Sequence, residues 1–320
     1  MRLLSLGALT LALTLSATPD AVAKCMKGLT TLLDLDPTVG ENPEGVAVDK
    51  KGNVFASVAP TGELLKIDKK GNISTLASFN PGAGFLLGMT TDGPGNVYVA
   101  LGSFDENTGV YRVTPSGDVS QVASMGAGTF PNDLVFDKSG NLYITESIAG
   151  AVYKLPKDGD IELWFQDDLL FGDPEISPVP FPIGANGIAV DGDSLLVSNS
   201  QQPRLVRIPV DCDGDPGDAD VLVEDDLLLG ADGIALDVHH DVYVAVNQQN
   251  LLLRVDADDG DIEILADAED GLDFPATLAF GRGPAGKENL YITNFALFSG
   301  PTGSPGVLRM NVGVPGISTP

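Results

Sequence analysis

Histidine and cysteine are scarce in this sequence. Its 320 residues include only two histidines, His239 and His240, and only two cysteines, Cys25 and Cys212. A Ser-His-Asp triad needs a histidine as its base, so nucleophilic catalysis of that kind has almost no candidates here. The cysteines allow at most one disulfide, which would tie the N-terminal arm to the rest of the chain. The sequence leaves open whether they pair, because it does not give the distance between them.

Lysine and arginine are also few. The chain has 18 of them against 45 Asp and Glu, which gives a net charge of -27 at pH 7. A surface of this sign repels the phosphates of nucleic acids and the anionic head groups of lipids. We therefore expect no nucleic-acid partner, and the charge favours a solubilising surface over a specific binding role.

Long apolar runs are missing after the N-terminal segment. Residues 1–23 combine a short basic start, an apolar run over residues 3–15 and a small-x-small ending, which predicts a signal peptide cleaved after Ala23. No later run approaches the ~20 residues of a membrane helix. A lipid anchor is not indicated either, because Lys24 directly precedes Cys25. We expect a secreted or periplasmic protein without a membrane anchor.

Six repeats of one pattern organise the rest of the chain. Each opens with an apolar strand, turns into a second strand and continues into a third, as in "PEGVAVDKKGNVFAS" from Pro43 and "PNDLVFDKSGNLYIT" from Pro131. Equivalent positions are residues 44, 87, 132, 186, 232 and 276. The number of residues between consecutive positions in this series is typical of four-stranded propeller blades. The sequence therefore predicts an all-β fold, a single six-bladed β-propeller domain over residues 24–320.

The sixth repeat has no fourth strand after its third. The other five repeats do, as in "ISTLASF" at residues 73–79, whereas the chain ends at "PGISTP". The segment "LTTLLDL" at residues 29–35 has the same pattern and no repeat of its own. We expect this N-terminal strand to complete the last blade and close the ring, because closure removes an open sheet edge.

The opening residues of the repeats gather oxygen around the propeller axis. The innermost strand of each blade lines the central channel, so the six equivalent residues form a ring at one face: Glu44, Leu87, Asn132, Asn186, Asp232 and Ala276. Carboxylate and amide oxygens converging in this way suit a hard divalent cation such as Ca²⁺. The other interpretation is that these side chains satisfy strand-end backbone groups around a water-filled channel.

Long loops surround the same face. Residues 166–184 and 295–305 are rich in apolar side chains, which suits either the wall of a small-molecule pocket or packing between blades. Glu146, Asn199 and Asn294 end second strands on this face and are candidates for an outer ring of substrate contacts. The two histidines belong to a hairpin turn on the opposite face.

The ordered motifs resemble those of the senescence-marker-protein, gluconolactonase and luciferin-regenerating-enzyme family of six-bladed propellers. They are "PEG" with Glu44, "PND" with Asn132, "ANG" with Asn186 and "ADG" with Asp232, in matching order at blade spacing. The resemblance implies that Glu44, Asn186 and Asp232 ligate a divalent metal. It also implies that Asn132 contacts substrate or metal-associated water and that Asp232 is the candidate base. Two departures are that Leu87 is apolar and that the substrate-binding Arg of sugar-lactone members has no clear counterpart.

The ring and the resemblance together predict a secreted hydrolase of a lactone or related ester that needs one divalent metal ion, with Ca²⁺ the first choice. The metal would polarise the carbonyl and acidify a water, and Asp232 would carry the proton. A second class of function stays open, because propellers serve both: a non-catalytic propeller that binds a small ligand or a protein partner on its looped face. We expect a monomer that acts on a small molecule.

Overall fold

The computed structural model describes residues 27–177, 179–283 and 286–317. These residues form 24 β-strands in six antiparallel four-stranded sheets. The expected signal peptide and Cys25 lie outside the described residues, and Cys212 is exposed. No helix in the described part of the chain is long and apolar enough to cross a membrane.

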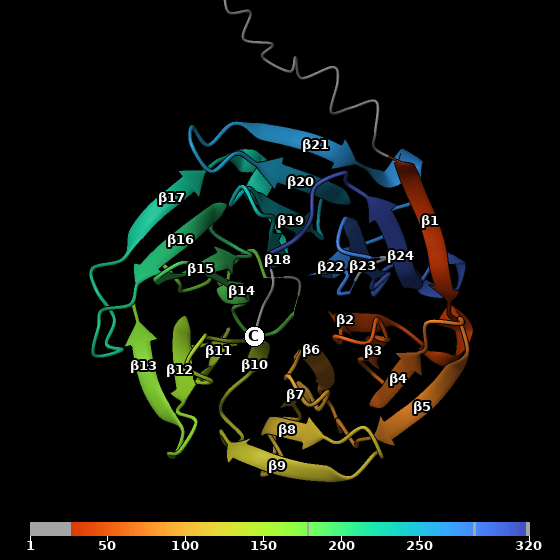
Figure 1. Cartoon of the computed structure of the whole chain (residues 1–320), viewed down its shortest axis with the longest axis horizontal. Helices are drawn as coiled ribbons and strands as arrows, with labels where there is room; N and C mark the ends of the chain where they lie inside the picture. The colour runs from red at the N-terminus through yellow and green to blue at the C-terminus, as the bar shows by residue number, and fades with distance from the viewer. Residues whose placement is uncertain (1–26, 178, 284–285, 318–320) are drawn as a thin grey trace, which may run out of the picture.

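The sheets stand around a central axis as the blades of a propeller (Figure 1). The first blade contains β2 (Pro43–Val48), β3 (Val54–Val58), β4 (Glu63–Ile67) and β5 (Ile73–Ser78). The second contains β6 (Phe85–Thr91), β7 (Val97–Gly102), β8 (Gly109–Val113) and β9 (Val119–Ser124). The third contains β10 (Pro131–Phe136), β11 (Leu142–Glu146), β12 (Ala151–Leu155) and β13 (Glu162–Gln166). The predicted six-bladed β-propeller is confirmed.

The remaining blades follow the same plan. The fourth contains β14 (Ala185–Asp191), β15 (Ser194–Asn199), β16 (Arg204–Pro209) and β17 (Asp220–Glu224). The fifth contains β18 (Ala231–Leu236), β19 (Val242–Val246), β20 (Leu251–Val255) and β21 (Ile262–Ala266). The sixth contains β22 (Pro275–Phe280), β23 (Asn289–Asn294), β24 (Gly306–Asn311) and β1 (Lys27–Asp34). Within the described ranges, loops carry four 3₁₀ helices: η1 (Pro37–Val39), η2 (Asp226–Leu228), η3 (Ala268–Asp270) and η4 (Gly300–Thr302).

β1 is the outermost strand of the sixth blade, although it comes first in the chain. It pairs antiparallel with β24, and the register places Thr30 opposite Arg309 and Leu33 opposite Val307. Figure 1 shows β1 beside β24 at the rim of this blade. Leu33 is 5% exposed and packs in a hydrophobic cluster with residues of the first blade. The N-terminal strand therefore connects the last blade to the first.

A repeated Asp-x-x-Gly-Asn turn joins strands within blades. In the turn after β2, Asp49 accepts hydrogen bonds from the backbone N–H of Asn53 at 2.9 Å and from its side-chain amide at 2.6 Å. Gly52 supplies the left-handed backbone conformation, with φ at +80°. The same pairing recurs for Asp92 with Asn96 and for Asp137 with Asn141. Some of the many acidic residues of this chain therefore stabilise the turns between strands.

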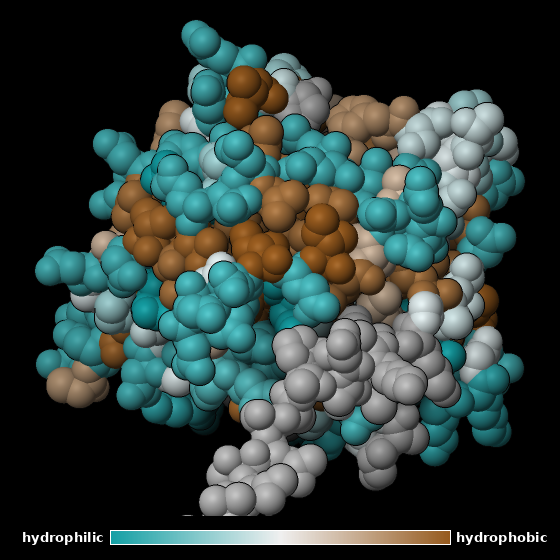
Figure 2. Space-filling view, turned by 90° about the horizontal axis from the view of Figure 1, so that it is seen from above, coloured by the Kyte–Doolittle hydropathy of each residue, from teal (hydrophilic) through white to brown (hydrophobic). Residues whose placement is uncertain are grey.

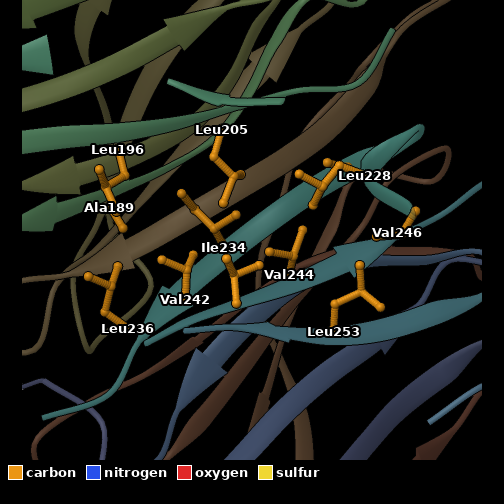
Figure 3. Close-up of a cluster of buried hydrophobic side chains, with 12 residues drawn as sticks. Ala189, Leu196, Leu205, Leu228, Ile234, Leu236, Val242, Val244, Val246 and Leu253 are labelled. Carbon is orange, nitrogen blue, oxygen red and sulfur yellow. The ribbon is translucent and has the colours of Figure 1, made fainter. Parts of the chain in front are cut away.

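The core lies between neighbouring blades. Figure 3 shows one cluster, in which Leu196 and Leu205 of the fourth blade meet Ile234, Val244 and Leu253 of the fifth. Each of these five side chains is at most 4% exposed. Burying a side chain of this size contributes about 1.5–3 kcal/mol. The stacking of the blades is therefore the main source of stability.

The burial of the strands decreases from the axis to the rim. All residues of β2 are buried, whereas β5 has none that are fully buried. Outer strands expose single apolar residues such as Val119 and Ile264. Figure 2 is turned by 90° from the view of Figure 1. It shows hydrophobic side chains between hydrophilic ones on the face of the molecule that it presents. The inner strands are therefore the rigid part on which a site can be held.

Glycines after the ring residues bring the inner strands close together. A Cβ at Gly45 would come within 2.5 Å of the Leu87 carbonyl oxygen, and one at Gly187 within 2.4 Å of the Asp232 carbonyl oxygen. Such distances leave no room for a side chain, so the Pro-Glu-Gly, Ala-Asn-Gly and Ala-Asp-Gly motifs need their glycine. The close approach of the inner strands is what makes the ring around the axis narrow.

Candidate functional site

Four inner strands bring the predicted polar ring together. Glu44, Asn132, Asn186 and Asp232 are the second residues of β2, β10, β14 and β18. All four line one pocket near the axis and none is more than 5% exposed. The equivalent Leu87 lines the pocket too, and Ala276 is fully buried. The ring expected from the repeat pattern is thus present as a geometric unit.

Two serines fix the orientation of the asparagine side chains. The Asn132 amide nitrogen donates to Ser147 Oγ at 3.0 Å, and that hydroxyl donates to the Ala185 carbonyl of the next blade at 2.7 Å. The Asn186 amide nitrogen donates to Ser200 Oγ at 2.8 Å, which in turn donates to the Ala231 carbonyl. Because each nitrogen is bound to a serine, each amide oxygen remains free for another partner.

Asn247 is a further polar residue of the pocket that the sequence reasoning did not select. It follows β19 directly, at the position that Ser147 and Ser200 occupy in their blades. Its amide nitrogen donates to Asp232 Oδ2 at 2.9 Å, which orients that carboxylate. A comparison of the residues immediately after each second strand would have revealed it.

Four oxygens of the pocket are buried without a hydrogen-bond partner in the described residues. They are Glu44 Oε2 and the side-chain oxygens of Asn132, Asn186 and Asn247. A buried acceptor left unpaired costs about 1–3 kcal/mol, and four acceptors facing one small space have no donor among themselves. Oxygen ligands of this kind are what Ca²⁺ binds. The donor set therefore fits a hard divalent cation.

A carboxylate cluster alone does not account for this site. Among the described residues, no group of three or more His, Cys, Asp or Glu side chains is arranged to hold a metal ion. A cation here would have to use the amide oxygens together with Glu44 and Asp232. The amides give the site oxygen without adding more negative charge at the axis.

Buried acidic groups repel one another along the channel. Burial, together with the charge of Asp133, raises the pKa of Asp232 to about 7, although the hydrogen bond from Asn247 acts in the opposite direction. Burial also raises the pKa of Glu44 well above its usual range, with the charges of Asp232 and Asp133 adding to the effect. A divalent cation between these groups would offset that repulsion.

Asp133 is the third acid of this channel and occupies a position where most inner strands have glycine. Its carboxylate accepts the backbone N–H of Leu134 at 2.8 Å and that of Ile188 at 3.3 Å. A Cβ at Gly88 would lie 2.5 Å from its Oδ1, so that glycine makes room for it. Burial raises the pKa of Asp133 to about 7.

A larger cavity lies on the other side of the ring. Its volume is about 570 Å³, and it is lined by the later residues of the inner strands, including Val48, Val135 and Leu236, and by Asp133. Glu44, Asn132, Asn186 and Asp232 do not line it. Size alone would therefore point away from the polar ring and its unpaired oxygens.

The pocket above the ring has an apolar wall. Its cavity volume is only about 60 Å³, and Phe181, Phe295 and Phe298 from the two long loops line it. Phe85 and Phe130 come from the second and third blades. Other apolar residues of the first long loop pack elsewhere: Leu170, for example, is fully buried in a core cluster between blades.

The proposed outer ring does not reach the pocket. Glu146, Asn199 and Asn294 are buried but are absent from its lining. Glu146 accepts the backbone N–H groups of Phe130 and Ala149, both at 2.7 Å. The two asparagines likewise bond to backbone groups of neighbouring loops. These contacts give all three a role in holding loops, and the site proposed below does not include them.

The histidines lie away from this pocket. They are in the turn that joins β18 to β19, and neither lines the pocket. His240 Nδ1 lies 2.5 Å from Asp191 Oδ1. The ring residues therefore have no imidazole beside them in the pocket lining.

Comparison with known proteins identifies relatives of this chain. Residues 128–296 match the sequence model of the SMP-30/Gluconolactonase/LRE-like region. No curated protein is significantly similar in sequence.

Solved structures of the same fold are similar over most of the chain. Regucalcin from Agrobacterium tumefaciens, described as a calcium-binding protein, has 20% identity and a TM-score of 0.68, over 91% of this chain and 97% of its own. A gluconolactonase from Xanthomonas campestris has 18% identity and a TM-score of 0.66, over 90% and 89%. A luciferin-regenerating enzyme has 16% identity and a TM-score of 0.66, over 91% and 98%.

Proposed function

This chain belongs to the SMP-30/Gluconolactonase/LRE-like family, and on that basis we propose that it is a divalent-metal-dependent hydrolase of a lactone or related ester. One observation carries the proposal. Four side-chain oxygens are buried at one point of the propeller axis without a hydrogen-bond partner in the described residues. The names of the similar structures, a gluconolactonase and a calcium-binding protein, support the same activity and the same ion.

The proposed metal ligands are Glu44, Asn186 and Asp232, with Ca²⁺ as the first choice of ion. The unpaired oxygens of Asn132 and Asn247 face the same pocket and add to the oxygen count. Ca²⁺ takes six to eight oxygens in a flexible arrangement. These five side chains together with solvent or substrate therefore supply a sufficient set.

The chemistry follows from what the ring can hold in place. When bound, the cation supplies Lewis-acid polarisation of an ester carbonyl and acidification of water. Asp232 is the proposed base, because Asn247 fixes the orientation of its carboxylate in the ring. Asn132 presents an acceptor oxygen, which can orient an attacking water through one of its hydrogens.

We also propose that the protein acts outside the cytoplasm. The support is the signal-peptide pattern of residues 1–23, with cleavage after Ala23. Mass spectrometry of the mature protein tests this, because a chain that begins at Lys24 is expected. An intact Met1 on protein recovered from the native host would contradict it.

Calorimetric titration with Ca²⁺ tests the metal site. We expect about one ion per chain, and a Glu44→Gln/Asp232→Asn double variant should lose most of the affinity. A double variant that binds as tightly as the parent would show that the ring is not the site.

Hydrolysis of a lactone panel with and without chelator tests the activity. We expect turnover that chelator abolishes and Ca²⁺ restores. If the parent binds metal and turns over no lactone or ester, a ligand-binding function of the same pocket becomes the better assignment.

A further inference from the structure

An arc of phenylalanine rings surrounds the pocket above the ring. Six of the 13 phenylalanines of the chain line it: Phe85, Phe130, Phe181, Phe274, Phe295 and Phe298. Consecutive ring centroids along the arc lie 4.9 Å apart for Phe181 and Phe130 and 5.0 Å apart for Phe274 and Phe298. Phe85 joins the two halves, at 6.5 Å from Phe130 and 6.2 Å from Phe295. The rings thus form one continuous apolar wall.

The backbone of this wall is held in unusual conformations. Five non-glycine residues have positive φ in the described part of the chain, and two of them, Phe274 and Ala296, lie in the loops that form the wall. Asp273 holds these loops together, because its carboxylate accepts two hydrogen bonds. One comes from the Ser299 hydroxyl at 2.5 Å and the other from the Ser304 N–H at 2.9 Å. A strained backbone persists only where surrounding contacts enforce it. The position of the rings is therefore built into the fold.

The wall offers almost no polar partners for a ligand. Among the described residues that line the pocket, none is lysine or arginine, and Gln201 and Gln248 are its polar side chains besides the ring, Ser200 and Asn247. Each hydroxyl of a sugar-like ligand would lose its hydrogen bonds to water on entering and find few replacements. A polyhydroxylated substrate does not suit such a wall.

Gln201 supplies one donor for a ligand. Its Oε1 accepts the Ile183 N–H at 3.0 Å, which fixes the direction of the amide. Its Nε2 is buried without a hydrogen-bond partner in the described residues, and the residue is 3% exposed. This NH2 group can donate to an acceptor oxygen of a ligand, such as the carbonyl or ring oxygen of an ester.

The small cavity sets where the bulk of a ligand lies. A volume of about 60 Å³ holds roughly an ion and one or two waters, since a water in the liquid takes about 30 Å³. The larger part of any substrate must therefore lie in the mouth of the pocket. Phe298 is 56% exposed there, so a ligand would cover ring surface that now faces water.

We propose that the substrate is a lactone or ester with an extended apolar substituent, which lies against the phenylalanine arc while its carbonyl points to the ring. This rests on the hydrolase function proposed above. In the reaction, the oxygen of water adds to the carbonyl carbon and the ester C–O bond breaks. One proton of the water goes to the leaving alkoxide oxygen, and the other is released as the new carboxyl group ionises. A lactone gives an apolar hydroxy carboxylate, and an open ester gives a carboxylate and an alcohol. Gln201 Nε2 donates to an ester oxygen and positions the substrate.

Three lactones with the same six-membered ring test the proposal: δ-valerolactone, δ-decalactone with its pentyl chain, and D-glucono-δ-lactone with its hydroxyls. We expect kcat/KM to be about 10- to 100-fold higher for δ-decalactone than for δ-valerolactone, because part of the chain is removed from water. D-glucono-δ-lactone should be the poorest of the three. If it is turned over as well as δ-decalactone, the proposal is overturned.

Phe298→Ala tests the wall directly. It should lower kcat/KM for δ-decalactone about fivefold or more and leave δ-valerolactone nearly unchanged. The matched control is Phe171→Ala, because Phe171 is 41% exposed on a neighbouring loop but does not line the pocket. Equal losses on both lactones, or equal losses in both variants, would contradict the proposal.

A binding measurement separates this proposal from the hydrolase function. The lactam 6-pentylpiperidin-2-one has the shape of δ-decalactone, and the amide resists hydrolysis. We expect calorimetry to show tighter binding than for piperidin-2-one, and Phe298→Ala should remove the difference. If no lactone is turned over but this difference is found, the hydrolase function fails and the apolar pocket stands. If the two lactams bind equally, the apolar pocket fails whatever the activity.

Discussion

At the scale of single residues, the site depends on how amide groups are oriented. An asparagine has an acceptor and a donor end, and only the acceptor end can bind a cation. Ser147 and Ser200 each accept a hydrogen bond from the amide nitrogen of one asparagine. Each hydroxyl also donates a hydrogen bond to a backbone carbonyl of the next blade. The serines therefore couple the direction of the ring oxygens to the packing of the blades.

The first prediction concerns Ser200→Ala. Removing the hydroxyl leaves Asn186 free to rotate, so Ca²⁺ affinity should fall about 10- to 100-fold, as for other groups that orient metal ligands. Calorimetric titration measures it. Ser103→Ala is the control, because Ser103 holds the same position in the second blade, whose ring residue is the apolar Leu87. If both variants bind Ca²⁺ as the parent does, the serine does not orient a ligand.

The second prediction concerns Asp232→Asn. The amide keeps an oxygen near the proposed cation but cannot take a proton at neutral pH, so turnover should fall by about 10² or more. Binding of Ca²⁺ should weaken less. The measurement is hydrolysis of the best lactone at metal concentrations that saturate every variant.

A double variant of the histidines is the control for that measurement. His239→Ala/His240→Ala should keep turnover within a few-fold of the parent, because neither residue lines the pocket. Near-parental turnover of Asp232→Asn together with loss in the histidine variant would contradict the proposed role of Asp232.

The sequence predicted the ring more completely than the residues around it. The repeat alignment placed Glu44 and Asp232 correctly at the axis because every inner strand begins at the same point. It selected Glu146 and Asn199, which come one residue before Ser147 and Ser200, the serines that bond to the ring asparagines. Side chains of a strand alternate between faces, so an offset of one residue is enough to exchange a pocket residue for one that holds loops.

At the scale of elements, the outer strand of the sixth blade is the least local part of the fold. β1 and β24 are separated by most of the chain, yet they pair along their length. The repeat pattern showed a missing strand at one end and a spare strand at the other, and this suggested the pairing. The loops were less predictable, because the two long ones divide their apolar residues between the pocket wall and the packing of blades.

The third prediction concerns this strand. Deleting residues 24–36 should lower the thermal unfolding midpoint strongly, because it removes every β1 partner of β24 and exposes a sheet edge. As a milder test, Leu33→Ala should cost about 2–4 kcal/mol, as for other buried leucines. Thr31→Ala is the matched control, because Thr31 is exposed on the same strand and should cost less than about 0.5 kcal/mol. An unchanged midpoint after the deletion would show that the ring does not depend on β1.

At the scale of the whole molecule, the acidic residues fall into two groups, which differ in where their carboxylates lie. Most of the 45 acidic residues lie at the surface or cap turns, where water or backbone N–H groups stabilise their charge. Glu44, Asp133 and Asp232 instead share the channel along the axis, where burial opposes ionisation. Without metal these groups can relieve the cost by binding protons, and a bound cation would offset it when they are ionised.

The last prediction follows from that cost. The pKa values of Asp133 and Asp232 are about 7 in the folded chain and near 3.8 for an ordinary Asp. Between these values the metal-free folded chain holds protons that the unfolded chain releases, so its stability falls as pH rises from about 4 to 7 and stays low above that. Ca²⁺ needs ionised ligands. Its stabilising effect should therefore grow from pH 5 to pH 8, which thermal unfolding with Ca²⁺ or with chelator measures.

The surface charge also destabilises the protein as pH rises, because a net charge of -27 repels itself. The Glu44→Gln/Asp232→Asn variant separates the two effects, since it keeps the surface and removes two of the buried acids. In this variant the metal-free chain should lose less stability between pH 5 and pH 8 than the parent, and Ca²⁺ should no longer raise its unfolding midpoint. If the variant loses as much stability with rising pH as the parent, the surface and not the channel sets the pH dependence. If Ca²⁺ stabilises the parent equally at both pH values, the ion binds groups other than these buried acids.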